Sequence, residues 1–219
     1  MSLFLLGALP LGALFVVLLP WDAKLVPHRP YLATVFLRGM LWALPAWAAV
    51  LVFRALVGDP PPLTGFRLYL TLLVAEQVLP IGLGLAAFLL AQRRLEFPHT
   101  EEGILLVALC FLAGFLSVLD IAEFLRSWQA WDAHALFLLP LQRFSAALSI
   151  SMAAHRFYRW EGSLGWLFAG LTAAALPVLA VFSFLFEINL VGVAWGLGCA
   201  LFAAAAVVFA LRYARVLRG

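Results

Sequence analysis

Long, continuously apolar stretches restrict this chain more than any other feature of its sequence. They read at approximately residues 3–20, 35–57, 66–91, 103–126, 134–155, 164–187 and 190–211. About 20 apolar residues in a helix cross the hydrocarbon core of a bilayer, and a spanning helix satisfies its backbone polar groups within its own segment. Because the stretches do not alternate apolar with polar residues, they exclude a transmembrane barrel. The sequence predicts an all-α, polytopic membrane protein, a bundle of about seven transmembrane helices.

The composition supports the same conclusion. Hydrophobic residues make up 66% of the chain and charged residues 11%, whereas soluble domains are about half apolar and a quarter charged. The loops between the stretches are short, so residues 1–219 are expected to form a single integral-membrane helical domain. The first stretch has no basic residue before it and no small-x-small cleavage site before Trp21, so we interpret it as a span rather than a signal peptide.

The distribution of positive charge along the chain indicates its orientation in the membrane. The net charge is only +3, and the basic residues are scattered through the loops, which argues against a nucleic-acid partner. Lysine and arginine are enriched in cytoplasmic loops of membrane proteins. Three of them fall on one predicted side (Arg54, Arg67 and Arg126), and ten fall on the other: Lys24, Arg29, Arg38, Arg93, Arg94, Arg156, Arg159, Arg212, Arg215 and Arg218. We therefore expect the amino terminus outside and the carboxyl terminus in the cytoplasm of a bacterial inner membrane.

A few polar residues lie inside the predicted spans, where ionisable side chains are costly and point to function. They are Glu76 with Gln77, Asp120 with Glu123, and Arg143. Counted from the outer ends of their spans at a 1.5 Å rise per residue, Glu76, Asp120 and Arg143 fall within roughly 6 Å along the membrane normal. Asp120 and Glu123 share one helix face through their i, i+3 spacing. These residues are expected to form one cluster in the outer half of the bundle, with Arg143 facing the carboxylates.

Three interpretations of this cluster remain open. The arginine and the carboxylates can form a buried ion-pair network that holds three helices together. Crowded carboxylates in a low-dielectric site can instead act as acid and base, in a catalytic or proton-handling role. The third interpretation is a water-lined pocket that binds a polar substrate or a lipid headgroup.

Signatures of cofactors and metals are missing. The four histidines, His28, His99, His134 and His155, sit in loops or at opposite membrane faces without cysteines nearby, which makes a poor zinc site. The chain has no HExxH, GxSxG or P-loop motif. No span carries paired histidines for haem, and the last span has no lysine for a retinal Schiff base. We therefore expect no cofactor and no metal.

Several local features predict details of packing. Gly192 and Gly196 form a GxxxG pair in the last span, which favours close helix packing within the protein. Cys110 and Cys199 lie inside apolar stretches and are expected to be buried thiols. Prolines inside the spans predict kinks: Pro45, Pro80, Pro140 and Pro177.

Several motifs of this sequence, spread over about residues 27–210, occur in the same order as in a known protein family. The resemblance begins at His28-Arg29-Pro30 and Phe36-Leu37-Arg38-Gly39, and continues through Glu76-Gln77-Val78-Leu79-Pro80 to Gly114-Phe115-Leu116-Ser117-Val118-Leu119-Asp120. This order resembles the PrsW family of glutamic-type intramembrane proteases. The resemblance implies the family's helical membrane fold, and it implies Glu76 and Asp120 as the catalytic residues that activate water.

The chain departs from the family pattern at several positions. The family's Glu-Glu-x-x-Lys motif keeps only Glu76, with Gln77 and Pro80 at the other positions, and its two helix histidines correspond to Arg143 and Ser183. These departures favour an inactive relative that keeps the fold and binds transmembrane segments of other proteins, although a surviving peptidase stays open. The alternatives are a small transporter or carrier of a polar or lipid-like substrate, and a membrane assembly or scaffold subunit. Membrane lipids are the other expected partners.

Overall fold

A computed structural model gives the tertiary structure and describes residues 29–57, 65–91, 101–127, 138–159 and 176–218. Within these ranges the chain is helical and contains no strand. The elements are α2 (Arg29–Val57), α3 (Phe66–Leu72), the π-helix η2 (Leu73–Val78), α4 (Leu79–Ala91), α5 (Glu101–Ser127), α6 (Leu139–Arg159) and α8 (Val191–Arg218). A shorter apolar helix, Leu176–Glu187, precedes α8. The prediction of an all-α protein is confirmed for this part of the chain.

Four helical segments in the described part are long and apolar enough to cross a membrane. They are Tyr31–Phe53, Phe66–Ala91, Leu106–Glu123 and Val191–Val208. They match four of the seven predicted spans. Of the remaining three, the span at 3–20 lies outside the described residues, and the span at 164–187 is described only from Leu176. The span at 134–155 corresponds to α6, which is not among the four candidates and carries Arg143 of the predicted cluster.

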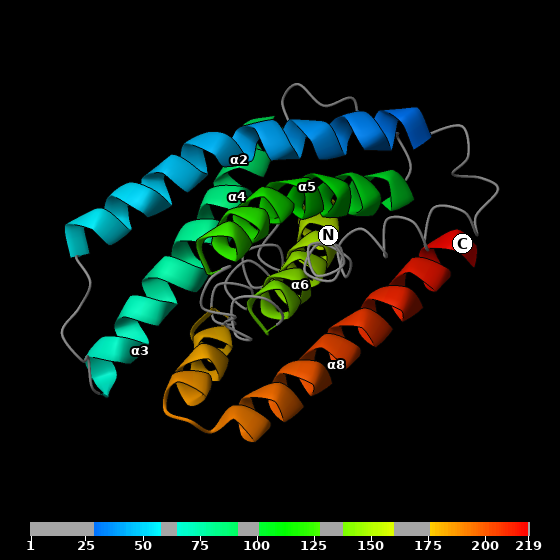
Figure 1. Ribbon diagram of the computed structural model, residues 1–219. Helices are drawn as coiled ribbons and strands as arrows, with labels where there is room; N and C mark the ends of the chain where they lie inside the picture. The colour runs from blue at the N-terminus through cyan, green and yellow to red at the C-terminus, as the bar shows by residue number, and fades with distance from the viewer. Residues whose placement is uncertain (1–28, 58–64, 92–100, 128–137, 160–175, 219) are drawn as a thin grey trace.

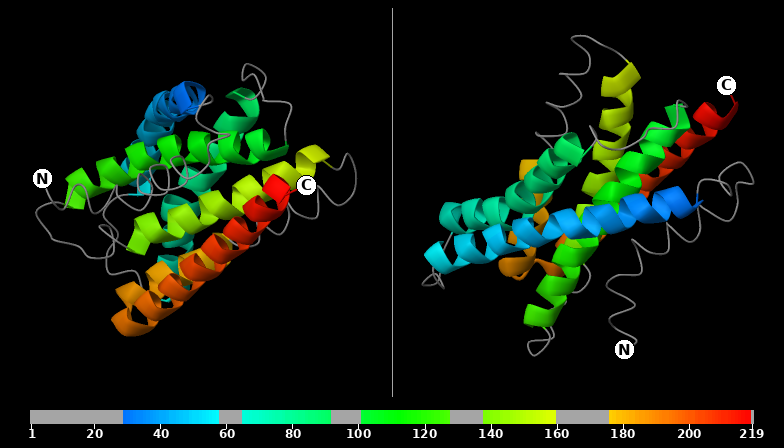
Figure 2. Two further views of the ribbon diagram at one scale, coloured as in Figure 1. Left: turned by 90° about the vertical axis from the view of Figure 1, so that its right-hand side faces the viewer. Right: turned by 90° about the horizontal axis from the view of Figure 1, so that it is seen from above.

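The helices stack in the order α2, α5, α6, α8 across the molecule. Figure 2, left, shows this order plainly, with α2 and α8 on opposite sides and α5 and α6 between them. The helix α5 contacts α2, α4, α6 and α8, so it forms the centre of the bundle. The continuous rod of α3, η2 and α4 packs beside α2 and α5 (Figure 1). Residues on α5 therefore reach every neighbouring layer.

Two glycines allow α2 and α5 to touch backbone to backbone where they cross (Figure 2, right). A Cβ atom placed on Gly39 would lie 2.1 Å from the carbonyl oxygen of Phe111, and one on Gly114 would lie 2.1 Å from the carbonyl oxygen of Phe36. The contact is reciprocal because both helices carry the same Phe-x-x-Gly spacing. Small residues permit such close approach in membranes, where dispersion contacts rather than the hydrophobic effect hold helices together.

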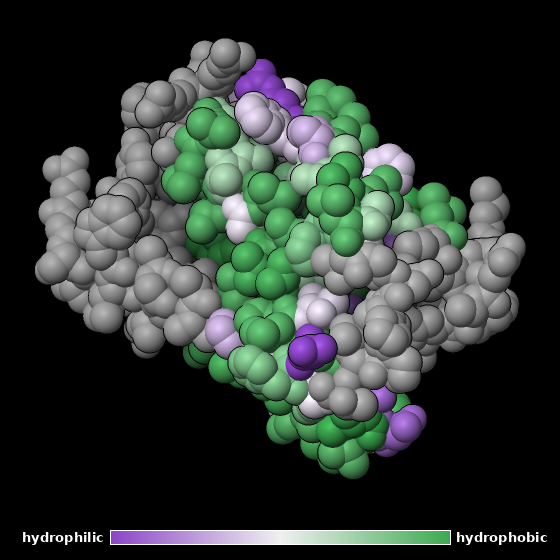
Figure 3. Space-filling model, turned by 90° about the vertical axis from the view of Figure 1, so that its left-hand side faces the viewer, coloured by the Kyte–Doolittle hydropathy of each residue, from purple (hydrophilic) through white to green (hydrophobic). Residues whose placement is uncertain are grey.

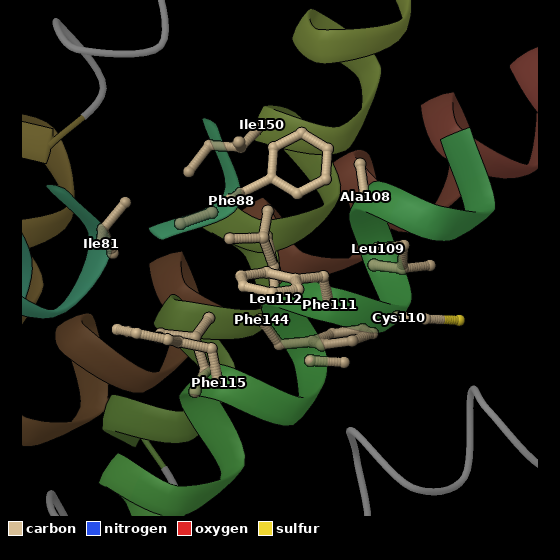
Figure 4. Packing of buried hydrophobic residues seen from close by; sticks show 14 of the residues in the cluster. Ile81, Phe88, Ala108, Leu109, Cys110, Phe111, Leu112, Phe115, Phe144 and Ile150 are labelled. Atoms are coloured by element: carbon tan, nitrogen blue, oxygen red, sulfur yellow. The ribbon is translucent and has the colours of Figure 1, made fainter. Parts of the chain in front are cut away.

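Aromatic side chains fill the space between the central helices. Phe111 of α5 packs against Phe88 of α4 at a ring separation of 5.6 Å, and Phe144 of α6 packs against Phe202 of α8 at 5.7 Å. Figure 4 shows the side chains of the cluster converging between these helices. Phe115 closes the cluster beside Gly84 of α4. Dense packing of this kind fixes α5 relative to its neighbours.

The outer surface is largely apolar, as expected of helices that face lipid. Many large hydrophobic side chains are exposed on α2 and α8, among them Leu41, Leu56 and Val207. Figure 3 shows one face on which hydrophobic residues cover most of the described surface. A water-soluble protein rarely exposes so large an apolar area. The surface therefore agrees with the membrane assignment made from the sequence.

Two expectations about packing are corrected. A Cβ atom on Gly192 or Gly196 would meet nothing within 4 Å among the described residues, because this face of α8 turns away from the bundle. The same orientation leaves Cys199 exposed, whereas Cys110 is buried as predicted.

Candidate intramembrane polar site

A π-helical turn presents the polar residues of the third predicted span to the bundle interior. Within η2, the consecutive residues Ala75, Glu76 and Gln77 are all buried. π-Helical turns are rare and occur often at functional sites. Pro80 lies four residues after Glu76 and has no N–H group to donate to the Glu76 carbonyl, as an α-helix would require. Arg143 Nε donates to that carbonyl oxygen instead, at 3.5 Å.

The central ion pair joins α5 to α6. Arg143 Nη1 donates to Asp120 Oδ1 at 2.6 Å, and the two side chains are only 2% and 3% exposed. Arg143 is the largest of the fully buried side chains. A charge buried this deeply is tolerated only when it is paired and hydrogen-bonded. Arg143 meets both conditions, and in doing so it ties together α5, α6 and η2.

A layer of amide side chains is formed by Gln77 and Gln142, the sequence neighbours of Glu76 and Arg143. Gln77 Nε2 donates to Gln142 Oε1 at 3.0 Å, and Ser183 Oγ donates to the same oxygen at 3.2 Å. All three residues are buried, so the layer links η2, α6 and the helix Leu176–Glu187. Asp120 Oδ2, Gln77 Oε1 and Gln142 Nε2 are buried and make no hydrogen bond to the described residues. The site therefore has capacity for further polar contacts.

A cavity of about 320 Å³ opens beside the ion pair. Its polar lining residues are Arg143 and Glu123, and Glu123 is itself 9% exposed. The remaining walls are apolar and come from α2, α4 and α5: Trp47, Val50, Leu51, Pro80, Leu119, Ala122 and Leu125. This volume lies at the lower end of the range typical of small-molecule sites. An apolar cavity with charged groups at one place is suited to a molecule with a polar group and an apolar body.

The chemistry available to the site is limited by the arginine. Arginine stays protonated at any physiological pH, so it can orient and neutralise a carboxylate but cannot exchange protons with it. The serines of α6 offer no nucleophile, because Ser145, Ser149 and Ser151 each donate to the backbone carbonyl four residues earlier. Within the described ranges, no group of three or more His, Cys, Asp or Glu side chains could hold a metal ion.

The structure brings the residues of the predicted cluster together. Asp120 contacts Arg143 directly, Glu76 does so through its carbonyl oxygen, and Glu123 lines the cavity that Arg143 also lines. Gln77 contacts Gln142 rather than Arg143. The catalytic roles of Glu76 and Asp120 stay a prediction. A pocket at the cluster was one of the three interpretations of the sequence, but its mostly apolar lining from α2, α4 and α5 was not foreseen. The proline four residues after Glu76 does signal the freed carbonyl oxygen that Arg143 bonds.

Comparisons of the chain with protein-family models, with curated proteins and with solved structures found no match. The resemblance to the PrsW family therefore stays a prediction that rests on the motifs of this sequence alone.

Proposed function

We propose that this chain is a multi-pass protein of the bacterial inner membrane with PrsW-like architecture, in which the polar cluster holds helices together and no longer cleaves peptide bonds. The observation that carries the proposal is the buried contact of 2.6 Å between Arg143 and Asp120. A carboxylate that activates water must take up and release a proton. A permanently charged guanidinium bonded to it favours a fixed ion pair instead.

The positions that the resemblance singles out support the architectural part of this proposal. Arg143, at the place of one family histidine, bonds to both the Asp120 side chain and the Glu76 carbonyl. Ser183, at the place of the other histidine, bonds to Gln142 in the adjoining amide layer. Motif positions more than 100 residues apart in the sequence thus converge on one region. Convergence is what a common fold requires, and the replaced residues account for the loss of chemistry.

The membrane orientation is part of the same proposal. The ten-to-three asymmetry of lysine and arginine favours an external amino terminus and a cytoplasmic carboxyl terminus. In this orientation the polar cluster lies in the outer half of the bundle. The four helical segments with enough length and hydropathy to span a membrane are compatible with this arrangement.

A comparison of single and double variants at the ion pair tests the structural role. Arg143→Leu should lower the free energy of unfolding by about 3–5 kcal/mol, because it leaves the Asp120 carboxylate buried without its cation. The double variant Asp120→Leu/Arg143→Leu should recover most of that loss, since apolar replacements of buried ion pairs are often neutral. Thermal unfolding of the purified protein measures both.

A peptidase assay is the second test of the proposed function. The reconstituted protein should leave transmembrane peptides uncut, as judged by mass spectrometry. Cleavage that disappears in Glu76→Gln would show an active protease and would overturn the proposal, whatever the comparison of variants gives. A double variant as unstable as Arg143→Leu alone would argue that the cluster is not a simple structural pair.

A carrier of a polar or lipid-like substrate is the second candidate function. The observation that favours it is the cavity of about 320 Å³ lined by Arg143 and Glu123. A cavity whose walls are apolar apart from these two charged side chains is suited to binding an amphiphilic molecule rather than to conducting ions. Transport would require a second opening, and a lipid-flipping assay in proteoliposomes would detect it.

A further inference from the structure

We propose that the cavity between α2, α4 and α5 binds an uncharged amphiphile of the diacylglycerol class, taken up sideways from the lipid. This inference rests on the proposed function, in which the polar cluster is a membrane-embedded structural site rather than a peptidase centre. It adds a ligand class and a place of binding.

The walls of the cavity and its mouth point to a ligand that enters from the bilayer. Among the lining residues, Trp47, Leu51 and Leu125 are 40%, 43% and 63% exposed. Trp47 and Leu51 belong to the candidate span Tyr31–Phe53, whose window is only 28% buried within the bundle. An opening framed by such side chains on a membrane-facing helix meets acyl chains rather than water. A ligand with an apolar body can enter there without leaving the lipid.

The polar lining offers both a donor and an acceptor. Arg143 has five N–H donors, and its hydrogen bonds to described residues use Nε and Nη1. The Nη2 group of this side chain therefore retains its capacity to donate to a ligand oxygen. A glutamate carboxylate has about four acceptor positions, so Glu123 can accept a hydrogen bond from a ligand hydroxyl in addition to its other contacts.

The charges of the site favour an uncharged ligand. Asp120 at 2.6 Å already compensates the charge of Arg143. A phosphate or a free carboxylate would place a second anion beside Glu123, and an ammonium group would meet the guanidinium. Burying an ion at this depth also carries a large desolvation free energy. For a hydroxyl and an ester carbonyl, hydrogen bonds to the site would offset the smaller desolvation free energy. A diacylglycerol carries these two groups next to its acyl chains, which fits the lining.

Quenching of Trp47 by brominated lipids tests the inference in the full-length protein. The protein is placed in phosphatidylcholine vesicles that contain diacylglycerol with brominated acyl chains, and the difference in fluorescence between wild type and Trp47→Phe isolates the cavity signal. Diacylglycerol should quench this signal with about tenfold preference over brominated phosphatidylcholine, the order expected from two hydrogen bonds. Unbrominated diacylglycerol should reverse the quenching by competition.

A cavity-filling variant and a second lipid sharpen the test. Ala122→Leu should abolish the preference, because Ala122 lines the cavity, whereas Ala204→Leu on the exposed side of α8 should retain it. Brominated phosphatidic acid with the same chains should show no preference over phosphatidylcholine. If phosphatidic acid binds better, the uncharged class is wrong. If diacylglycerol quenches no better than phosphatidylcholine, or if Ala122→Leu retains the preference with unchanged Tm, this cavity does not bind it.

Failure of this inference is distinguishable from failure of the proposed function. Peptide cleavage dependent on Glu76 would overturn the proposed function even if diacylglycerol binds. Absence of lipid preference in a protein that cleaves nothing would remove only the ligand assignment.

Discussion

The crossing of α2 and α5 permits a sharp prediction about stability. In Gly114→Ala, the new Cβ atom would lie 2.1 Å from the Phe36 carbonyl oxygen, whereas real Cβ atoms essentially never approach closer than 3.0 Å. The two backbones must therefore shift relative to each other at this point. The obstacle is backbone rather than a flexible side chain, so no rotamer change can relieve it.

The energetic cost follows from this displacement. Separating packed atoms by 0.5–1 Å forfeits about a quarter to a half of their dispersion energy, and overpacking of a well-packed core costs about 1–3 kcal/mol or more. Because α2 makes its most extensive contacts with α5, we expect Gly114→Ala to cost about 3 kcal/mol. For a protein of this size, that corresponds to a fall in Tm of about 6–12 °C. Gly39→Ala should behave alike, since its contact with the Phe111 carbonyl oxygen is equally short.

Gly196→Ala is the matched control, because it makes the same chemical change on a helix without a described neighbour within 4 Å. It should leave Tm unchanged or raise it slightly, since alanine is the better helix former by up to about 1 kcal/mol. Intrinsic tryptophan fluorescence of the purified protein during heating measures all three variants. A Gly114→Ala protein that unfolds within 2 °C of Gly196→Ala would refute the close backbone contact and, with it, the arrangement of α2 on α5.

Three further predictions follow from burial and bonding. Phe111→Ala should cost about 3–5 kcal/mol in thermal unfolding, because this fully buried ring packs against α4. Gln142→Leu should cost about 1–3 kcal/mol by leaving Gln77 buried without its partner, and Gln77→Leu/Gln142→Leu should recover part of it; additive losses would contradict the contact. A hydrophobic maleimide should modify the exposed Cys199 in detergent before the buried Cys110, as mass spectrometry of the peptides can show; equal rates would contradict their placement.

Much of the candidate site could be anticipated because position along a spanning helix is a local property. A rise of 1.5 Å per residue converts a residue count into depth, and this placed Glu76, Asp120 and Arg143 at one level. Depth does not specify direction around a helix, however. Which carboxylate Arg143 bonds, and that it reaches Glu76 through the backbone, depends on how α5, α6 and η2 are rotated against one another.

The glycine pairs also show that a sequence motif alone does not predict which residues form a helix contact. The GxxxG pair at Gly192 and Gly196 has the stronger local pattern, yet it faces away from the described helices, while Gly39 and Gly114 make the close crossing. A small-residue motif states only that a close approach is possible. Its use depends on a partner helix, and here the backbone that Gly39 contacts, at Phe111, lies 72 residues further along the chain.

The sequence by itself determined the solvent of this protein and the helical character of its described segments, because hydropathy and backbone satisfaction act within one stretch of about 20 residues. It also predicted that Glu76, Asp120 and Arg143 lie at one level, and the contacts of Arg143 with the other two agree with this. Only the tertiary structure decided the partner of Arg143, the reciprocal glycine contact and the cavity between α2, α4 and α5. These features form between segments distant in the chain, and packing rather than local composition selects them.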